Sequence, residues 1–271
     1  MSRINPSSRV IAVIQGRMSS SRLPGKILMD IAGQPMLWHV VERVRMAETI
    51  DEVLVATTND PSDDPAAEFC QQNGIPVYRG SLYDVLDRFY QAARTYQADV
   101  VVRVTADCPL IDPLVIDRTV NELLESGADF CANRLPPPWK RTYPIGLDTE
   151  VCTFAALERA WREASQPHER EHVMPYLYDL PGRFIVRVIN AEQDYGNLRW
   201  TVDTPEDLVV VRRLFELLGG RRDFTWQDVL AVWLDHPELA EINAQVKHHQ
   251  FDEVDERYQN SPADKPGKEA R

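Results

Sequence analysis

The sequence has no apolar run as long as the roughly 18 residues that a membrane-spanning helix needs. Its start, MSRINPSSRV, lacks the apolar core of a secretion signal, so we expect a cytoplasmic protein with no membrane partner. Cysteine is also scarce, with 4 in 271 residues and no Cys-x-x-Cys pair, which argues against a zinc site or a disulfide framework. We expect buried free thiols at Cys70, Cys108, Cys131 and Cys152.

The sequence also has no excess of basic over acidic residues. The 42 Asp and Glu outnumber the 30 Lys and Arg, for a formal net charge of −12. Proteins that track nucleic-acid backbones normally present a basic surface, so we expect no nucleic-acid partner. A small anionic ligand remains compatible with this charge, because it needs only a local cluster of Arg and Lys or a metal held by carboxylates.

The first half of the chain alternates between buried-strand and helical patterns. Continuous apolar runs at residues 10–14, 52–58 and 99–104 predict strands buried on both faces, with a short strand at 77–78. Helical patterns fall between and after them, at 35–48, 64–73, 82–96 and 113–126. This alternation predicts an α/β fold with a mostly parallel sheet flanked by helices.

The second half is less regular. Residues 134–152 form an insertion, which we expect either to hold a second substrate or to be a surface connection. Helices are predicted at 154–163, 168–179 and 205–218 and from 225 and 237, with strands at 184–189 and 198–202. Residues 1–250 are predicted to form one domain, and the polar residues 251–271 a disordered tail.

Ligands of parallel sheets bind at the carboxyl ends of the strands, which draws attention to residues 16–26 (GRMSSSRLPGK) after the first strand. Small residues and three cations suit a polyphosphate. A Walker A loop is excluded because Ile27 follows Lys26, and a dinucleotide fingerprint because only one glycine follows the strand directly. The alternative is a solvated basic loop. The predicted phosphate contacts are Gly16, Arg17, Ser19, Arg22 and Lys26.

Two carboxylates follow apolar segments in the same way. Asp107 comes after the strand at 99–104, and Asp203 after the strand expected at 198–202. On neighbouring strands, two such residues could hold one Mg²⁺ against a triphosphate. Taken singly, Asp107 is equally compatible with a turn before Pro109, and Asp203 with a helix N-cap. Together with the loop at 16–26 they favour the metal site.

Three segments in order resemble a known family. IQGRMSSSRLPGKIL, ADCPLID and WTVDTPEDL are similar to the signatures of the cytidylyltransferases that activate acidic sugars, the CMP-sialic acid and CMP-Kdo synthetases. YRGSLYDVLDR, YPIGLDTEV and EREHVMPY resemble the SpsF-like branch of spore coat polysaccharide biosynthesis. The resemblance covers about residues 9–218. It implies a Rossmann-like nucleotidyltransferase (GT-A-like) domain, CTP, Mg²⁺ and an acidic acceptor as ligands, and a homodimer.

The resemblance also implies roles for residues. Arg17 and Lys26 would contact the triphosphate and act with Asp107 in catalysis, while Asp107 and Asp203 would bind Mg²⁺. Thr57 would contact the base, and the nucleotide or sugar pocket would be lined by Arg79, Asp84 and Arg88. The second substrate would face Asp148, Glu150 and His172, although His172 is equally compatible with a helix surface.

Two departures concern the acceptor. The family's common IPAR reads IQGR here, with Gly16 in place of alanine, and QGDxPL reads VTADCPL. Neither change removes the metal aspartate, Asp107, but the acceptor is not identified. The expected reaction is attack of an acceptor oxygen on the α-phosphorus of CTP, with pyrophosphate leaving. The alternatives are a glycosyltransferase of similar fold, which the absence of any Asp-x-Asp disfavours, and a catalytically silent nucleotide-binding protein.

Overall fold

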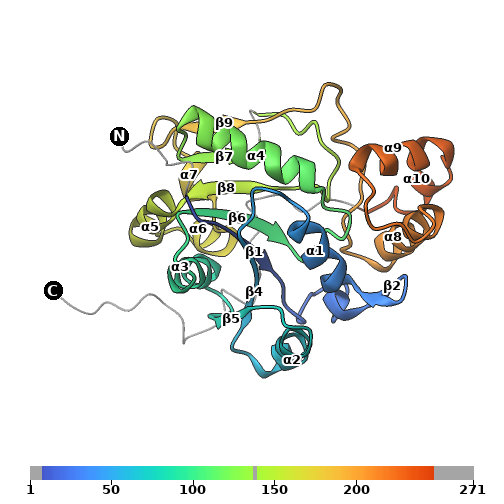
Figure 1. The fold of residues 1–271 in the computed structure, drawn as a ribbon, viewed down its shortest axis with the longest axis horizontal. Coiled ribbons are helices and arrows are strands. Elements are labelled where there is room, and N and C mark those ends of the chain that lie inside the picture. The colour runs from blue at the N-terminus through green and yellow to red at the C-terminus, as the bar shows by residue number, and fades with distance from the viewer. Residues whose placement is uncertain (1–7, 137–138, 247–271) are drawn as a thin grey trace.

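The computed structural model describes residues 8–136 and 139–246, which build a seven-stranded sheet with helices on both faces (Figure 1). The strand order is β5-β4-β1-β6-β8-β7-β9, and β8 alone runs antiparallel to its neighbours β6 and β7. The strands are β1 (Val10–Gln15), β4 (Glu52–Thr58), β5 (Val77–Gly80), β6 (Val100–Thr105), β7 (Phe130–Ala132), β8 (Glu150–Thr153) and β9 (Val186–Val188). The expected mostly parallel sheet flanked by helices is confirmed.

The side chains of β1 alternate between two apolar layers. Val10, Ala12 and Ile14 pack into one layer, and Ile11 and Val13 into the other. The first layer also takes the buried faces of α1 (Met36–Arg45), α2 (Asp64–Gln72) and α4 (Pro113–Ser126). The second takes α3 (Val85–Thr95), α5 (Phe154–Glu163) and α7 (Pro175–Tyr178). Burial on both faces explains why these strands read as continuous apolar runs.

The chain after the sheet forms a helical group beside it. Figure 1 shows α8 (Pro205–Leu217), α9 (Trp226–Asp235) and α10 (Leu239–Ile242) packed together at one end of the molecule. The remaining elements are the short hairpin β2 (Asp30–Ile31) and β3 (Gln34–Pro35), the 3₁₀ turns η1 (Lys26–Leu28) and η2 (Pro61–Asp63), and α6 (Pro167–His172). None of the helices in the described residues is long and apolar enough to cross a membrane.

Two predicted elements of the second half are wrong. The helix expected at 168–179 is broken into α6 and α7, because Val173 between them has φ of 72°. The strand expected at 198–202 is absent: Arg199 makes only an isolated bridge to Ile145. Gly146 permits this close approach, since a Cβ on it would lie 2.7 Å from the backbone nitrogen of Thr201.

Other expectations agree with the structure. All four cysteines are buried free thiols. The six helices predicted at 35–48, 64–73, 82–96, 113–126, 154–163 and 205–218 match within three residues at each end. The one expected from 82 begins at Val85, because the Asp84 side chain caps it by accepting from the Asp87 backbone nitrogen. The three-residue strand β7 was not expected, since so short a run carries little periodicity. The tail at 251–271 lies outside the described residues.

Candidate active site

The loop that follows β1 folds tightly against the edge of the sheet. The Gly16 backbone nitrogen donates to the Ala56 carbonyl at 3.3 Å, and a Cβ on Gly16 would lie 2.8 Å from the Cβ of Ala106. A side chain at residue 16 would therefore require Ala106 or the loop to shift where the loop passes the end of β6. At the other end, Gly25 adopts φ of 73° and donates from its backbone nitrogen to the Met18 carbonyl at 2.8 Å. The turn that results sends Lys26 into the protein.

Lys26 joins the two predicted metal ligands. Its Nζ donates to Asp107 Oδ2 at 2.8 Å, to Asp203 Oδ1 at 2.9 Å and to the Val202 carbonyl at 2.8 Å. Burial by itself lowers the pKa of Lys26, but the attraction of Asp107 and Asp203 outweighs it and leaves that pKa raised. We call Lys26, Asp107 and Asp203 the lysine–carboxylate cluster. Residues far apart in the sequence thus meet as one charged site.

The backbone brings the two carboxylates together. The Val202 backbone nitrogen and the Thr201 hydroxyl both donate to the Asp107 carbonyl, at 2.9 and 3.1 Å. Arg22 adds a second cation from the loop, 3.0 Å from Asp203 Oδ1. Burial would raise the pKa of Asp203, but Lys26, Arg22 and Arg199 together lower it well below the usual range. Asp203 is therefore held ionised.

The lysine–carboxylate cluster has the chemistry of a partial Mg²⁺ site. Carboxylate oxygens are hard ligands, and Mg²⁺ is commonly bound by one or two carboxylates together with substrate phosphates and water. Within residues 8–136 and 139–246, no group of three or more His, Cys, Asp or Glu is placed to hold a metal alone. The residues present therefore fit a metal that arrives with a polyphosphate and completes its shell from it.

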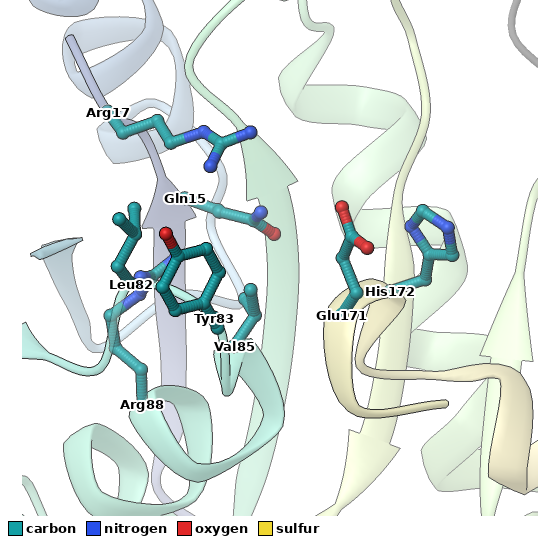
Figure 2. Close-up of a pocket in the computed structure, with 8 residues that line it drawn as sticks. All are labelled: Gln15, Arg17, Leu82, Tyr83, Val85, Arg88, Glu171 and His172. Carbon is teal, nitrogen blue, oxygen red and sulfur yellow. The ribbon is translucent and has the colours of Figure 1, made fainter. Parts of the chain in front are cut away.

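A pocket opens beside the loop at the carboxyl end of β1. Figure 2 shows Gln15, Arg17 and Tyr83 on one side of it and Glu171 and His172, from the end of α6, on the other. The lining is completed by Leu82, Val85 and Arg88. The structure thus brings the predicted residues Arg17, Arg88 and His172 together.

Arg88 is nearly fully buried in this lining. Its Nη1 donates to the Ser81 carbonyl at 2.6 Å, while its Nε has no hydrogen-bond partner among the described residues. Burial, helped by the nearby positive charge of Arg17, lowers the pKa of Arg88 to about 10. A buried donor without a partner is costly, so Arg88 points to a ligand that accepts a hydrogen bond.

Three of the residues predicted to contact the base or to line the nucleotide or sugar pocket lie outside this pocket lining. Thr57 is fully buried, and its hydroxyl donates to Asp63 Oδ2 at 2.9 Å. Because Asp63 Oδ1 also accepts from the Met18 backbone nitrogen at 2.7 Å, Thr57 and Asp63 together brace the loop at 16–26. Arg79 donates to the Thr58 carbonyl and pairs with Asp64, and Asp84 pairs with Arg170 of α6. Their polar groups are engaged within the protein.

A second charged site continues along the same edge of the sheet. Arg103 donates to Gln15 Oε1 at 3.1 and 3.0 Å and pairs with Glu150. Further along, Asp148 Oδ2 accepts from Arg134 Nε at 3.2 Å and from Arg141 Nη2 at 2.8 Å. Burial opposes the charge on Arg134, but Asp148 and Glu150 raise its pKa above the usual value. We call these residues the arginine–carboxylate row: Arg103, Arg134, Arg141, Asp148 and Glu150.

The sequence had pointed to Asp148, Glu150 and His172 but not to their neighbours. The three arginines, Gln15 and Glu171 were missed. One signal was present, because Arg103 interrupts an otherwise apolar strand, VVVRVT, and an arginine there must face a charged or polar partner. Arg134 and Arg141 lie outside the helices and strands, Gln15 ends β1 and Glu171 lies in α6, and the contacts of all four depend on the tertiary fold.

Comparison with known proteins agrees with this geometry. The profile of the cytidylyltransferase family matches residues 11–213. A 3-deoxy-manno-octulosonate cytidylyltransferase of Anaeromyxobacter sp. is 38% identical over 79% of this chain and 99% of its own. The spore coat polysaccharide biosynthesis protein SpsF of Bacillus subtilis is 29% identical over 85% of this chain and 96% of its own.

A solved structure gives the same result. A cytidylyltransferase from Leptospira borgpetersenii superposes with a TM-score of 0.81 at 33% identity, covering 89% of this chain and all of that one. The profile match spans the loop at 16–26, the pocket and both aspartates of the lysine–carboxylate cluster. The chain belongs to the cytidylyltransferase family.

Proposed function

We propose that this cytidylyltransferase transfers CMP from CTP to an acidic sugar or a related acid, such as a phosphonate, with Mg²⁺ as cofactor and pyrophosphate as second product. The observation that carries the proposal is Lys26 Nζ, 2.8 Å from Asp107 and 2.9 Å from Asp203, at the end of the loop that follows β1. Cations and carboxylates in contact are what a metal-bound polyphosphate requires.

The triphosphate would lie against the phosphate loop. Arg17, Arg22 and Lys26 supply its cations, and Lys26 would turn from the carboxylates to phosphate oxygens as Asp107 and Asp203 take up the metal. When bound, Mg²⁺ would neutralise charge on the phosphate oxygens. The side chains of this chain contribute positioning and charge stabilisation.

The pocket beside Arg17 suits the nucleoside. Arg88 Nε is a buried donor without a hydrogen-bond partner among the described residues. Cytosine presents two acceptors, its carbonyl oxygen and its ring nitrogen. Glu171, across the pocket from Gln15, offers an acceptor for the exocyclic amine (Figure 2). This lining has the donors and the acceptor that a cytosine edge needs.

The arginine–carboxylate row suits the second substrate. Three guanidinium groups face two carboxylates there, so the row retains one positive charge for an anionic group of the acceptor. The name of the Anaeromyxobacter relative, which acts on a sugar acid, supports an acid. An acceptor oxygen would form the new bond to the α-phosphorus, and the α–β bridging bond would break as pyrophosphate leaves.

The test is pyrophosphate release with each nucleoside triphosphate, Mg²⁺ and a panel of sugar acids and phosphonates. We expect release with CTP and at least one acid, and none in EDTA. Release with another nucleotide alone would remove the assignment of CTP. Hydrolysis of a nucleotide sugar without pyrophosphate release would instead favour a glycosyltransferase, and nucleotide binding without any turnover a silent binding protein.

A homodimer and a cytoplasmic location stay predictions. The first is checked by light scattering on the purified chain, for which we expect twice the 31.0 kDa of one copy. A monomer at micromolar concentration would contradict it.

A further inference from the structure

A buried hydrogen-bond network stands behind Asp203. Its centre is the fully buried carboxylate of Asp207, in the first turn of α8. Asp207 Oδ2 accepts from the backbone nitrogens of Asp203 and Thr204 at 3.0 and 3.1 Å. Arg199 donates to both of its oxygens at 2.9 Å, and Asn243 Nδ2 donates to Oδ1 at 3.0 Å. The backbone on both sides of the Asp203 peptide is thereby fixed.

Arg199 extends the network to the side chain of Asp203. Its Nη2 donates to Asp203 Oδ2 at 2.8 Å while the same nitrogen contacts Asp207. Asp203 Oδ1 is left to face Lys26 and Arg22. Because Asp203 Oδ2 is bound to the planar guanidinium of Arg199, the orientation of Asp203 Oδ1 toward Lys26 is fixed.

Asn243 brings a distant part of the chain into this arrangement. It caps the carboxyl end of α10, is 6% exposed, and donates from Nδ2 to the Arg199 carbonyl at 3.2 Å as well as to Asp207. A neutral amide that contacts both members of a buried ion pair adds no charge and fixes their separation. The last described helix is thus joined to Asp203 through two side chains.

A second helix start shows what capping alone requires. α9 has the same Thr-x-x-Asp capping box as α8, made by Thr225 and Asp228. Asp228 accepts from the Thr225 backbone nitrogen at 2.7 Å but has no buried arginine or asparagine partner among the described residues, and its side chain is 38% exposed. The buried Arg199 and Asn243 at α8 therefore exceed what a capping box needs.

We propose that Asp207, Arg199 and Asn243 are positioning residues that aim Asp203 Oδ1 at the lysine–carboxylate cluster, so that α10 takes part in building the metal–triphosphate site. This inference rests on the proposed function, in which Asp203 is a metal ligand. Groups that orient metal ligands typically contribute about 10–100-fold to metal affinity or activity.

The experiment compares Arg199→Lys and Asn243→Ala with Asp228→Ala in the full chain. Mn²⁺ affinity in the presence of CTP is measured by electron paramagnetic resonance, and the thermal midpoint and kcat are measured on the same samples. We expect Mn²⁺ affinity and kcat to fall about tenfold in Arg199→Lys and several-fold in Asn243→Ala. Asp228→Ala should lower the thermal midpoint while keeping Mn²⁺ affinity within about twofold, because it removes a cap only.

Two results would overturn the inference in distinguishable ways. Wild-type Mn²⁺ affinity in both network variants, with a lowered thermal midpoint, would leave the network a purely structural cap and the proposed function intact. No CTP-dependent Mn²⁺ binding by the wild-type chain would remove the proposed metal site and the inference with it.

Discussion

The two charged sites at the carboxyl edge of the sheet are built differently. The lysine–carboxylate cluster joins residues 81 and 177 positions apart through one ammonium group. The arginine–carboxylate row pairs residues 47, 14 and 7 positions apart through guanidinium groups. An ammonium is a point charge on a flexible stem, whereas a guanidinium is a rigid fork. The lysine–carboxylate cluster is therefore suited to exchanging its cation, and the arginine–carboxylate row to holding a fixed shape.

The largest expected effect is a loss of kcat when a carboxylate of the lysine–carboxylate cluster is removed. Asp107→Ala and Asp203→Ala should each lower pyrophosphate release about 10²-fold or more, because each removes an oxygen ligand of the metal. The measurement is kcat at saturating CTP and acceptor, with Asp228→Ala as a control for damage to a helix start. Near-normal kcat in either variant would remove that residue from the metal site.

The next prediction concerns the cation of the first site. Lys26→Met leaves Asp107 and Asp203 facing each other without their shared partner, which should lower the free energy of unfolding by about 2 kcal/mol without metal. Mg²⁺ should then raise the thermal midpoint of Lys26→Met more than that of the wild type, since the ammonium no longer competes. Equal Mg²⁺ shifts in the two proteins would show that Lys26 and the metal do not share a position.

The row is expected to act on the acceptor alone. Arg141→Ala removes one of the three guanidinium groups and leaves the row without a net positive charge, so it should raise the KM for the anionic acceptor about tenfold, worth roughly 1.4 kcal/mol, with the KM for CTP unchanged. Steady-state kinetics with each substrate varied in turn makes the test. A rise of the same size in the KM for CTP would show that the row also affects CTP binding and would contradict its assignment to the acceptor.

The smallest effect is a dependence on pH. The pKa of Asp203 is lowered in the folded protein, so the group stabilises the fold above the ordinary carboxylate pKa and loses this contribution as pH falls toward the lowered value. The difference in unfolding free energy between wild type and Lys26→Met should therefore shrink by about 1 kcal/mol from pH 7 to pH 3. Chemical denaturation at both pH values measures it, and a constant difference would show that Lys26 stabilises by packing alone.

The sequence allowed the first site to be predicted and the second only in part. Lys26, Asp107 and Asp203 follow strand-like segments, and ligand residues of parallel sheets gather at that edge. Asp203 lies beside Asp107 although its segment is not a strand, because the Ile145–Arg199 bridge holds that segment at the edge of the sheet. That both aspartates contact the same lysine, Lys26, could not be predicted from either segment alone.

The remaining features depend on contacts between distant segments. Thr57 was expected to read the base, but burial directs its hydroxyl to Asp63. Antiparallel β8, which places Glu150 against Arg103, follows from a turn in an insertion without periodicity. Asn243 gives no sign in the sequence of a link to Asp203, because that link runs through the tertiary packing of α10 on α8.

The most direct test of the division between the two sites is the gain in CTP affinity when Mg²⁺ replaces EDTA, measured by titration calorimetry. The wild type should bind CTP more tightly with Mg²⁺ than in EDTA. This gain in affinity should be about tenfold smaller in Asp203→Asn and should stay within about twofold of the wild-type gain in Asp148→Asn. An unchanged gain in Asp203→Asn, or an equal loss in Asp148→Asn, would contradict the assignment of metal and triphosphate to the lysine–carboxylate cluster.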